Sequence, residues 1–201
     1  MYKFLLVILV LTTACHSAKI ETPTTSTAPV AAAVNAPAYK PGPSPTDTEV
    51  REAILRNYED AAVIDSSRPT PFLVGDFNGD NSEDIAIVVK PGKGKLSKLN
   101  SEYANWILED PRQPLHVRDL KTRPAPVTVS DKDSLLAVIH GVKSEGWRSA
   151  IAKQTYLLKN AAGESFEKQS SRRGDVIREK LDGADGVIYF TGAKYAWHPV
   201  I

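Results

Sequence analysis

The sequence contains one cysteine and almost no net charge, and both shortages exclude classes of protein. Cys15 is the single cysteine among 201 residues, which excludes an internal disulfide and any zinc site built on cysteines. The 25 Lys and Arg residues nearly balance the 24 Asp and Glu residues, and the formal net charge is +1. Nothing in the overall charge therefore argues for a nucleic-acid partner, and none is expected.

Long hydrophobic runs are also scarce. The apolar stretch at residues 4–11 is far shorter than the roughly 20 residues that a membrane-spanning helix needs. Lys3 precedes this stretch and the small residues 12–14 follow it. This order predicts a secretory signal peptide over residues 1–14.

The end of the predicted signal peptide, Thr-Thr-Ala-Cys at residues 12–15, resembles the lipobox of bacterial lipoproteins. The resemblance implies cleavage before Cys15, lipidation of this cysteine and anchoring of the mature protein in the bacterial cell envelope. The folded part would then lie on the periplasmic or extracellular side. Because His16 and not Asp follows the cysteine, we expect the outer membrane if the host is Gram-negative. An ordinary cleaved signal peptide with an incidental cysteine is the alternative.

The chain after Cys15 divides into a tether and one domain. Residues 15–46 are rich in Pro, Thr, Ala and Ser and show no apolar period, so they cannot bury enough surface to fold and are predicted to be disordered. The remaining residues, 47–201, are numerous enough for one hydrophobic core but not for two.

The pattern of the domain changes from one helix to many short strands. Thr46 and Glu49 have the spacing of a capping box, and apolar residues follow at helical intervals, which predicts a helix. Apolar runs of strand length then follow one another at residues 72–74, 85–89, 135–139, 155–158, 176–181 and 187–190. This succession predicts an α+β fold with a mostly antiparallel, meandering sheet and the N-terminal helix packed on one face.

Three further segments give finer predictions. Residues 101–108 predict a short helix, and residues 189–199 predict a hairpin that turns at Gly192. The Pro-containing residues 110–127 are expected to form a surface connection or an edge strand.

Acidic and amide side chains alternate in one short stretch before a predicted strand. With Asp76 as the first position, Asn78, Asp80, Ser82 and Asp84 occupy the third, fifth, seventh and ninth positions. Alternate residues of a tight loop point toward one centre, and calcium prefers about six to eight oxygen ligands. The four side chains and the main-chain carbonyl of Ser82 therefore predict a structural calcium site. A polar turn without an ion is the alternative.

This stretch resembles the calcium loop of FG-GAP and VCBS-type repeats, whose pattern is Asp-x-(Asp/Asn)-x-Asp-x-x-x-Asp between two strands. In that family the repeats build β-propellers and calcium stiffens each hairpin. Ile87 stands where an EF-hand requires a bidentate Glu, so the loop is not an EF-hand. Residues 131–133 and 182–185 each contain two aspartates and lack the other ligands. A propeller needs about 4–8 blades, so the resemblance implies one calcium loop in a small bacterial lipoprotein and no propeller.

Signatures of catalysis are few. Neither a G-x-S-x-G nor an H-E-x-x-H motif occurs. His140 follows the strand predicted at residues 135–139, and Glu145 lies nearby in a glycine-containing loop. This pair is the candidate for acid–base chemistry in an envelope hydrolase. The alternative is a loop whose His and Arg residues cap strand ends.

The C-terminal residues are unusually aromatic. Tyr189, Tyr195 and Trp197 alternate with smaller or polar residues and either complete the core or form a binding face for a partner or a glycan. The sequence as a whole predicts a lipid-anchored, calcium-stabilised envelope protein that binds another envelope protein or a polysaccharide without catalysing a reaction. An envelope hydrolase that uses His140 is the alternative.

Overall fold

The structure is a computed structural model, and it describes residues 39–69, 71–113, 125–163 and 166–200. The predicted signal peptide, Cys15 and most of the predicted tether lie outside the described residues. Within the described ranges no helix combines the length and the apolar character needed to cross a membrane.

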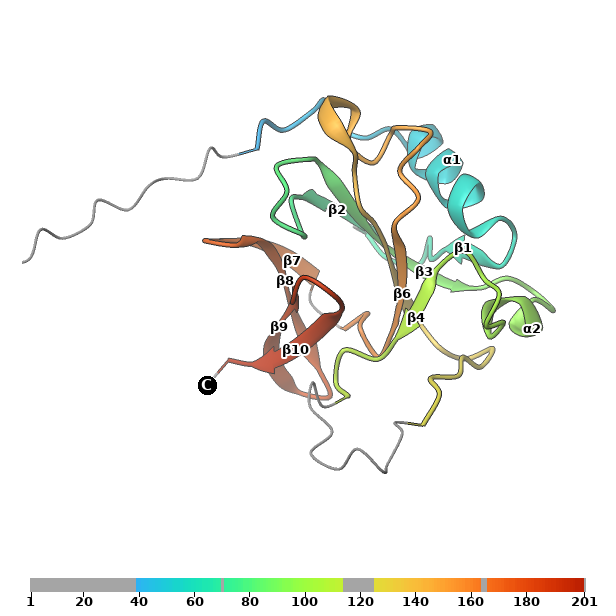
Figure 1. Cartoon of the computed structure of the whole chain (residues 1–201). Helices are drawn as coiled ribbons and strands as arrows, with labels where there is room; N and C mark the ends of the chain where they lie inside the picture. Colours follow the sequence, from blue (N-terminus) through green and yellow to red (C-terminus); the bar gives the residue numbers. More distant parts are fainter. Residues whose placement is uncertain (1–38, 70, 114–124, 164–165, 201) are drawn as a thin grey trace, which may run out of the picture. The chain divides into compact units, whose positions relative to one another are not determined.

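Ten strands form two sheets, and the first sheet has six of them among the described residues (Figure 1). They are β1 (Ala62–Ile64), β2 (Phe72–Gly75), β3 (Asp84–Pro91), β4 (Ile107–Glu109), β5 (Leu135–Ile139) and β6 (Thr155–Lys159). Their order is β1-β3-β5-β6-β4, and β2 also pairs with β3. Only the pair of β4 and β6 is parallel in this sheet.

The second sheet is a four-stranded meander in the order β10-β9-β8-β7. Its strands are β7 (Phe166–Ser171), β8 (Gly174–Leu181), β9 (Ala184–Phe190) and β10 (Tyr195–Pro199). The predicted aromatic hairpin is confirmed, because β9 and β10 pair antiparallel and Gly192 has a φ of 95° in the turn. The predicted α+β fold is confirmed as well, with two sheets in place of one.

The N-terminal helix α1 (Asp47–Tyr58) begins at the predicted capping box. The backbone N–H of Glu49 donates to Thr46 Oγ1 over 3.3 Å, and the backbone N–H of Thr46 donates to Glu49 Oε2 over 2.8 Å. The hydrogen bonds that the Thr46 backbone N–H and hydroxyl donate to the Glu49 carboxyl lower its pKa to about 2. The apolar side of α1 packs on one face of the first sheet, where Val50, Ile54 and Tyr58 are buried.

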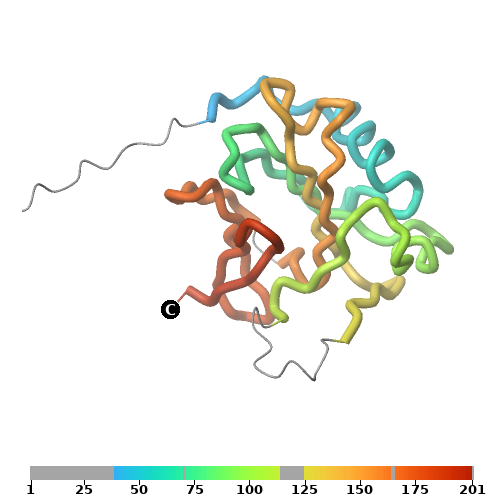
Figure 2. The backbone as a smooth tube through the Cα atoms, viewed as in Figure 1, coloured from blue at the N-terminus to red at the C-terminus, as the bar shows by residue number. Residues whose placement is uncertain are grey.

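The central strands of the first sheet are buried on both faces. Residues 85–89 of β3 and 135–139 of β5 are all 0% exposed. Ile85, Ile87 and Val89 contact the core beneath α1, whereas Ala86 and Val88 contact the core shared with the second sheet. Burial on both faces explains why these strands are apolar throughout and do not alternate with polar residues. The described domain therefore has three layers, which are α1, the first sheet and the second sheet (Figures 1 and 2).

The helix predicted at residues 101–108 is wrong. A short helix, α2 (Leu96–Leu99), precedes this segment, and Ile107 already belongs to β4. Trp106 is buried, but Tyr103 is 87% exposed, so the aromatic side chains do not share one buried helical face. Pairing of Ile107 with Tyr156 on β6 outweighs the local helical pattern. In the stretch at 110–127, the described residues 110–113 and 125–127 form no strand, and residues 114–124 lie outside the description.

The capping box gives a stability prediction. Thr46→Ala should lower the free energy of unfolding by about 1 kcal/mol, because the backbone N–H of Glu49 in the first turn of α1 loses its hydrogen-bond acceptor. Thr48→Ala is the matched control, since Thr48 is exposed in the first turn of the same helix and Ala has the higher helix propensity. Urea unfolding of both variants measures the difference. Equal stability of the two variants would show that the capping box does not stabilise α1.

Candidate functional site

The five predicted calcium ligands all lie in, or directly after, the connection between β2 and β3. Antiparallel pairing sets Gly75 opposite Asp84, so residues 76–83 form a closed loop, which we call the acidic loop. Gly79 and Asn81 have positive φ angles of 77° and 67°. Gly adopts this left-handed conformation freely and Asn tolerates it, which lets the loop turn tightly.

Asp76 lies at the centre of the acidic loop. Its Oδ1 accepts hydrogen bonds from the backbone N–H groups of Gly79 at 2.7 Å and Asp80 at 3.0 Å, and its Oδ2 accepts one from Asn81 at 2.9 Å. Burial raises the pKa of the Asp76 carboxyl, and these three N–H groups act in the opposite direction. The loop therefore wraps around one carboxylate.

Asp84 connects the acidic loop to the first sheet. Its Oδ2 accepts from the backbone N–H groups of Phe77 at 2.7 Å and Asn78 at 3.1 Å, and its Oδ1 accepts from that of Gly141 at 2.6 Å. The side chain is completely buried, and this burial raises its pKa to about 8. Asp84 thus joins the acidic loop to the segment after β5 through backbone amides, a role that its sequence position did not reveal.

Asp80 and Asn78 lie on the exposed part of the loop. Asp80 Oδ1 accepts from the backbone N–H of Ser82 at 2.7 Å, and Asp80 Oδ2 accepts from the Asn78 amide at 2.9 Å. Each oxygen of Asp80 therefore accepts one hydrogen bond and keeps further acceptor capacity. These oxygens are of the type that a hard cation prefers.

The proposed calcium ligands differ in how many hydrogen bonds their oxygens already accept within the protein. Asp76 Oδ1 and Asp84 Oδ2 each already accept two N–H groups inside the protein, whereas each oxygen of Asp80 accepts one. Within the described residues, no three His, Cys, Asp or Glu side chains gather in an arrangement that could hold a metal ion. Calcium at Asp76, Asn78, Asp80, Ser82 and Asp84 stays a prediction.

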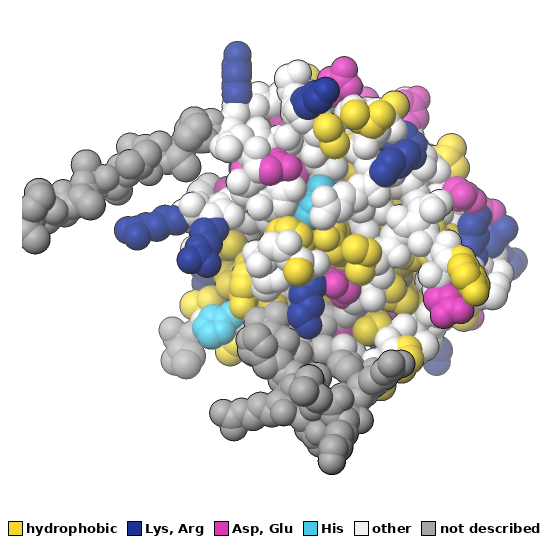
Figure 3. All heavy atoms as spheres, viewed as in Figure 1, with side chains coloured by type: hydrophobic (Ala, Val, Ile, Leu, Met, Phe, Trp, Pro, Cys, Tyr) yellow, Lys and Arg dark blue, Asp and Glu magenta, His cyan; other side chains and the backbone are white. Residues whose placement is uncertain are grey.

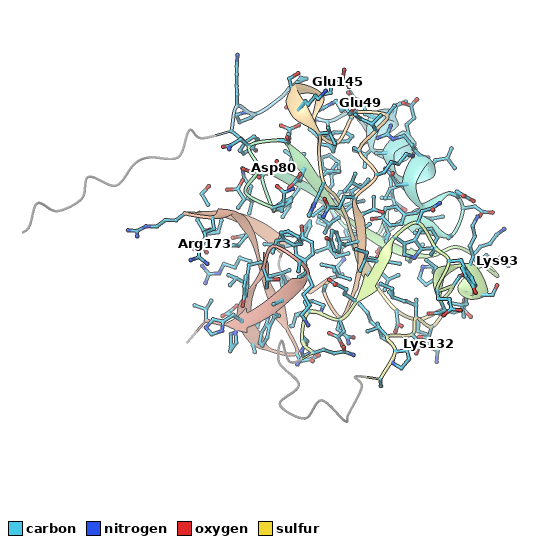
Figure 4. The ribbon with its side chains drawn as sticks, in the orientation of Figure 1. Glu49, Asp80, Lys93, Lys132, Glu145 and Arg173 are labelled. Carbon is cyan, nitrogen blue, oxygen red and sulfur yellow. The ribbon has the colours of Figure 1, made fainter. Side chains whose placement is uncertain are left out.

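The acidic loop also contacts the second sheet at the turn between β7 and β8. The backbone N–H of Asp175 donates to the Asp76 carbonyl at 2.6 Å, and the Asp76 N–H donates to Asp175 Oδ2 at 3.2 Å. A Cβ atom on Gly79 would lie 2.5 Å from the Arg173 carbonyl oxygen, so only Gly fits there. Figure 4 labels Asp80 and Arg173 on these two adjoining segments. The loop is thus a joint between the two sheets.

A groove lies beside this joint, with a volume of about 1050 Å³. One wall is the acidic loop, through Phe77, Asn78 and Gly79, and the others come from the turn between β7 and β8 and from β8, β9 and β10. In the space-filling view, basic side chains border a hydrophobic area over the second sheet (Figure 3). We call this feature the sheet-end groove.

A second polar cluster lies on the other side of the acidic loop. Glu83 Oε1 accepts from Arg148 Nη1 at 2.8 Å and from Trp147 Nε1 at 3.0 Å, and the Arg148 guanidinium lies 4.2 Å from the centre of the Trp147 ring. Both Glu83 and Trp147 are buried. A buried carboxylate needs such a charged partner, so the cluster is structural.

This cluster also holds the end of the predicted tether. The Gly42 N–H donates to Glu83 Oε2 at 2.7 Å, and Arg148 Nη2 donates to the Pro43 carbonyl at 2.7 Å. Arg148 further pairs with Glu49 of α1 at 2.9 Å. The contacts of the domain therefore begin ahead of Asp47, the predicted boundary, and no sequence signal indicated them.

The structure does not bring His140 and Glu145 together. His140 is buried, its Nε2 lies 2.7 Å from the Tyr195 hydroxyl, and its ring packs 5.0 Å from Tyr156 and 4.9 Å from Phe190. Glu145 belongs to the exposed 3-10 helix η1 (Lys143–Glu145), as Figure 4 shows. Among the described residues it makes no hydrogen bond with His140. The histidine completes an aromatic core.

Comparisons of the chain with protein families, with curated proteins and with solved structures found no match. The resemblance to FG-GAP and VCBS-type loops therefore rests on the acidic loop and its flanking strands alone. The function has to be argued from the geometry of the sites.

The burial of His140 predicts an unusual titration. Burial disfavours the imidazolium and lowers its pKa to about 4, so the ring should stay neutral at pH 6. NMR titration of the ring measures this directly. In the urea-unfolded chain the same ring should titrate near the ordinary value of about 6.5. A pKa near that value in the folded protein would mean that solvent reaches His140, and would restore it as an acid–base candidate.

Proposed function

We propose that this chain is a lipid-anchored protein of the bacterial cell envelope that binds a partner or polymer and does not catalyse a reaction. Its domain would be stiffened by one calcium ion in the acidic loop. The observation that carries the proposal is the position of that loop, which joins β2 to β3, contacts β8 and forms one wall of the sheet-end groove.

The charges of the loop support the calcium part of the proposal. Burial is the main reason that the pKa values of Asp76 and Asp84 are raised, and repulsion by the negative charge of Asp80 raises both further. The side chains of Asp76, Asn78, Asp80 and Asp84 would bind the ion, together with the Ser82 carbonyl. Calcium would remove the repulsion and hold the acidic loop against the second sheet.

The remaining observations favour binding over catalysis. The hydrolase alternative depends on His140 acting with a nearby acid, but His140 is buried against aromatic rings and Glu145 is exposed on η1. The sheet-end groove, in contrast, is open to solvent and lined by aromatic, aliphatic and basic side chains. Such a mixture of apolar surface and a few polar groups is typical of binding sites.

Calcium binding is tested by the melting temperature of the purified protein in calcium and in chelator. At about a hundredfold excess of calcium over the dissociation constant, the ion should add about 2.7 kcal/mol of stability. This corresponds to a melting temperature that is higher by about 5–10 °C. Asp80→Ala should abolish the difference between the two conditions.

Asp131→Ala is the matched control for that experiment, since Asp131 is an exposed aspartate outside the acidic loop. It should keep the full calcium-dependent shift. Asp80→Ala also removes the hydrogen bond from Ser82, so each variant is compared with itself, with and without calcium. No shift in the wild type, together with no bound metal, would rule out the ion.

The lipid anchor gives an independent prediction. Labelled palmitate should be incorporated into the wild-type protein and should be absent from Cys15→Ser, because the thiol at residue 15 is the predicted acylation site. Cell fractionation should find the wild type in the membrane fraction and the variant outside it. A Cys15→Ser protein that stays membrane-bound would contradict the anchor.

A further inference from the structure

The charge of the sheet-end groove is positive and not compensated within it. Arg172 and Arg173 line the groove at the turn between β7 and β8, and both are exposed. Neither guanidinium forms an ion pair among the described residues. Asp175 is the one acidic residue in the described lining, and it is buried and paired with Lys168 at 3.3 Å. Two arginines therefore remain available to an anionic ligand.

The floor of the groove is a patch of sheet surface. Val187 and Tyr189 are two positions apart on β9, so they share one face, and both are half-buried. His198 is the partner of Val187 across to β10 and continues this face. The result is a shallow aromatic and aliphatic surface next to the two arginines.

We propose that the sheet-end groove binds an anionic polysaccharide that carries carboxylate groups. A sugar ring presents an apolar C–H face that stacks on an aromatic side chain such as Tyr189, and the guanidinium fork of Arg172 or Arg173 fits a carboxylate in a bidentate geometry. Charge complementarity and an open, shallow groove favour an extended polymer. This inference rests on the proposed binding function and names its ligand class.

The acidic loop connects this site to the predicted calcium site. Asn78 and Gly79 belong to the loop and also line the groove. Calcium in the loop should therefore hold this wall in place and increase the affinity for the polymer. The two arginines act with or without the ion, so the two proposals can fail separately.

The experiment measures binding of a hyaluronan octasaccharide to the full chain in detergent by isothermal titration calorimetry. Arg172→Ala/Arg173→Ala should weaken binding at least tenfold, and Tyr189→Ala several-fold. Lys93→Ala/Lys132→Ala is the matched control, because it removes two exposed positive charges on the side away from Arg173 (Figure 4). This control should change the affinity less than twofold. The methyl ester of the octasaccharide should bind at least tenfold more weakly than the acid, and added salt should weaken binding of the acid.

The outcomes separate the alternatives. Absent binding, equal binding of the methyl ester, or equal losses in the arginine and lysine variants would each overturn the proposal. So would arginine-dependent binding to phosphatidylglycerol vesicles without binding to the octasaccharide, which would indicate a lipid surface. Arginine-dependent binding that is the same in calcium and in chelator would support the groove and overturn the expected increase of polymer affinity by calcium. A calcium-dependent melting shift without octasaccharide binding would support the ion and overturn the groove.

Discussion

Three hydrogen bonds to the buried carboxylate of Asp84 hold together the part of the molecule on which the candidate sites depend. They come from the backbone N–H groups of Phe77, Asn78 and Gly141, and so connect the acidic loop with the end of β5. Burying a polar group away from water is costly, and hydrogen-bond donors reduce this cost. The position of the loop relative to the first sheet therefore follows from satisfying this one group.

The acidic loop, which Asp84 fixes on the first sheet, also contacts the second sheet. Its backbone exchanges hydrogen bonds with Asp175, and Gly79 lies directly against the Arg173 carbonyl. The sheet-end groove opens at this contact, so its shape depends on the loop. On the other side of the loop, Glu83 binds Arg148 and the backbone of Gly42, which holds the chain entering α1. The candidate calcium ligands, one wall of the groove and the contacts to Gly42 thus lie in one short segment.

The structural features that depend on residues close in sequence were predictable. The capping box of α1, the apolar runs of β3 and β5 and the turn at Gly192 each depend on residues close in sequence, and all are confirmed. The helix predicted at residues 101–108 does not form, because Ile107 pairs in parallel with Tyr156 of β6, which is far away in the chain. The role of Asp84 was missed for the same reason, since one of its partners is Gly141.

The sequence by itself determined the class of fold, the tightly turning acidic loop and the residues able to offer oxygen ligands. These follow from periodicity, from turn residues and from side-chain chemistry, which act over a few positions. Only the tertiary structure decided that there are two sheets, that His140 lies in an aromatic core away from Glu145, and that Arg172 and Arg173 border a groove. These features depend on burial and on contacts between segments that are distant in the chain, so no short sequence pattern predicts them.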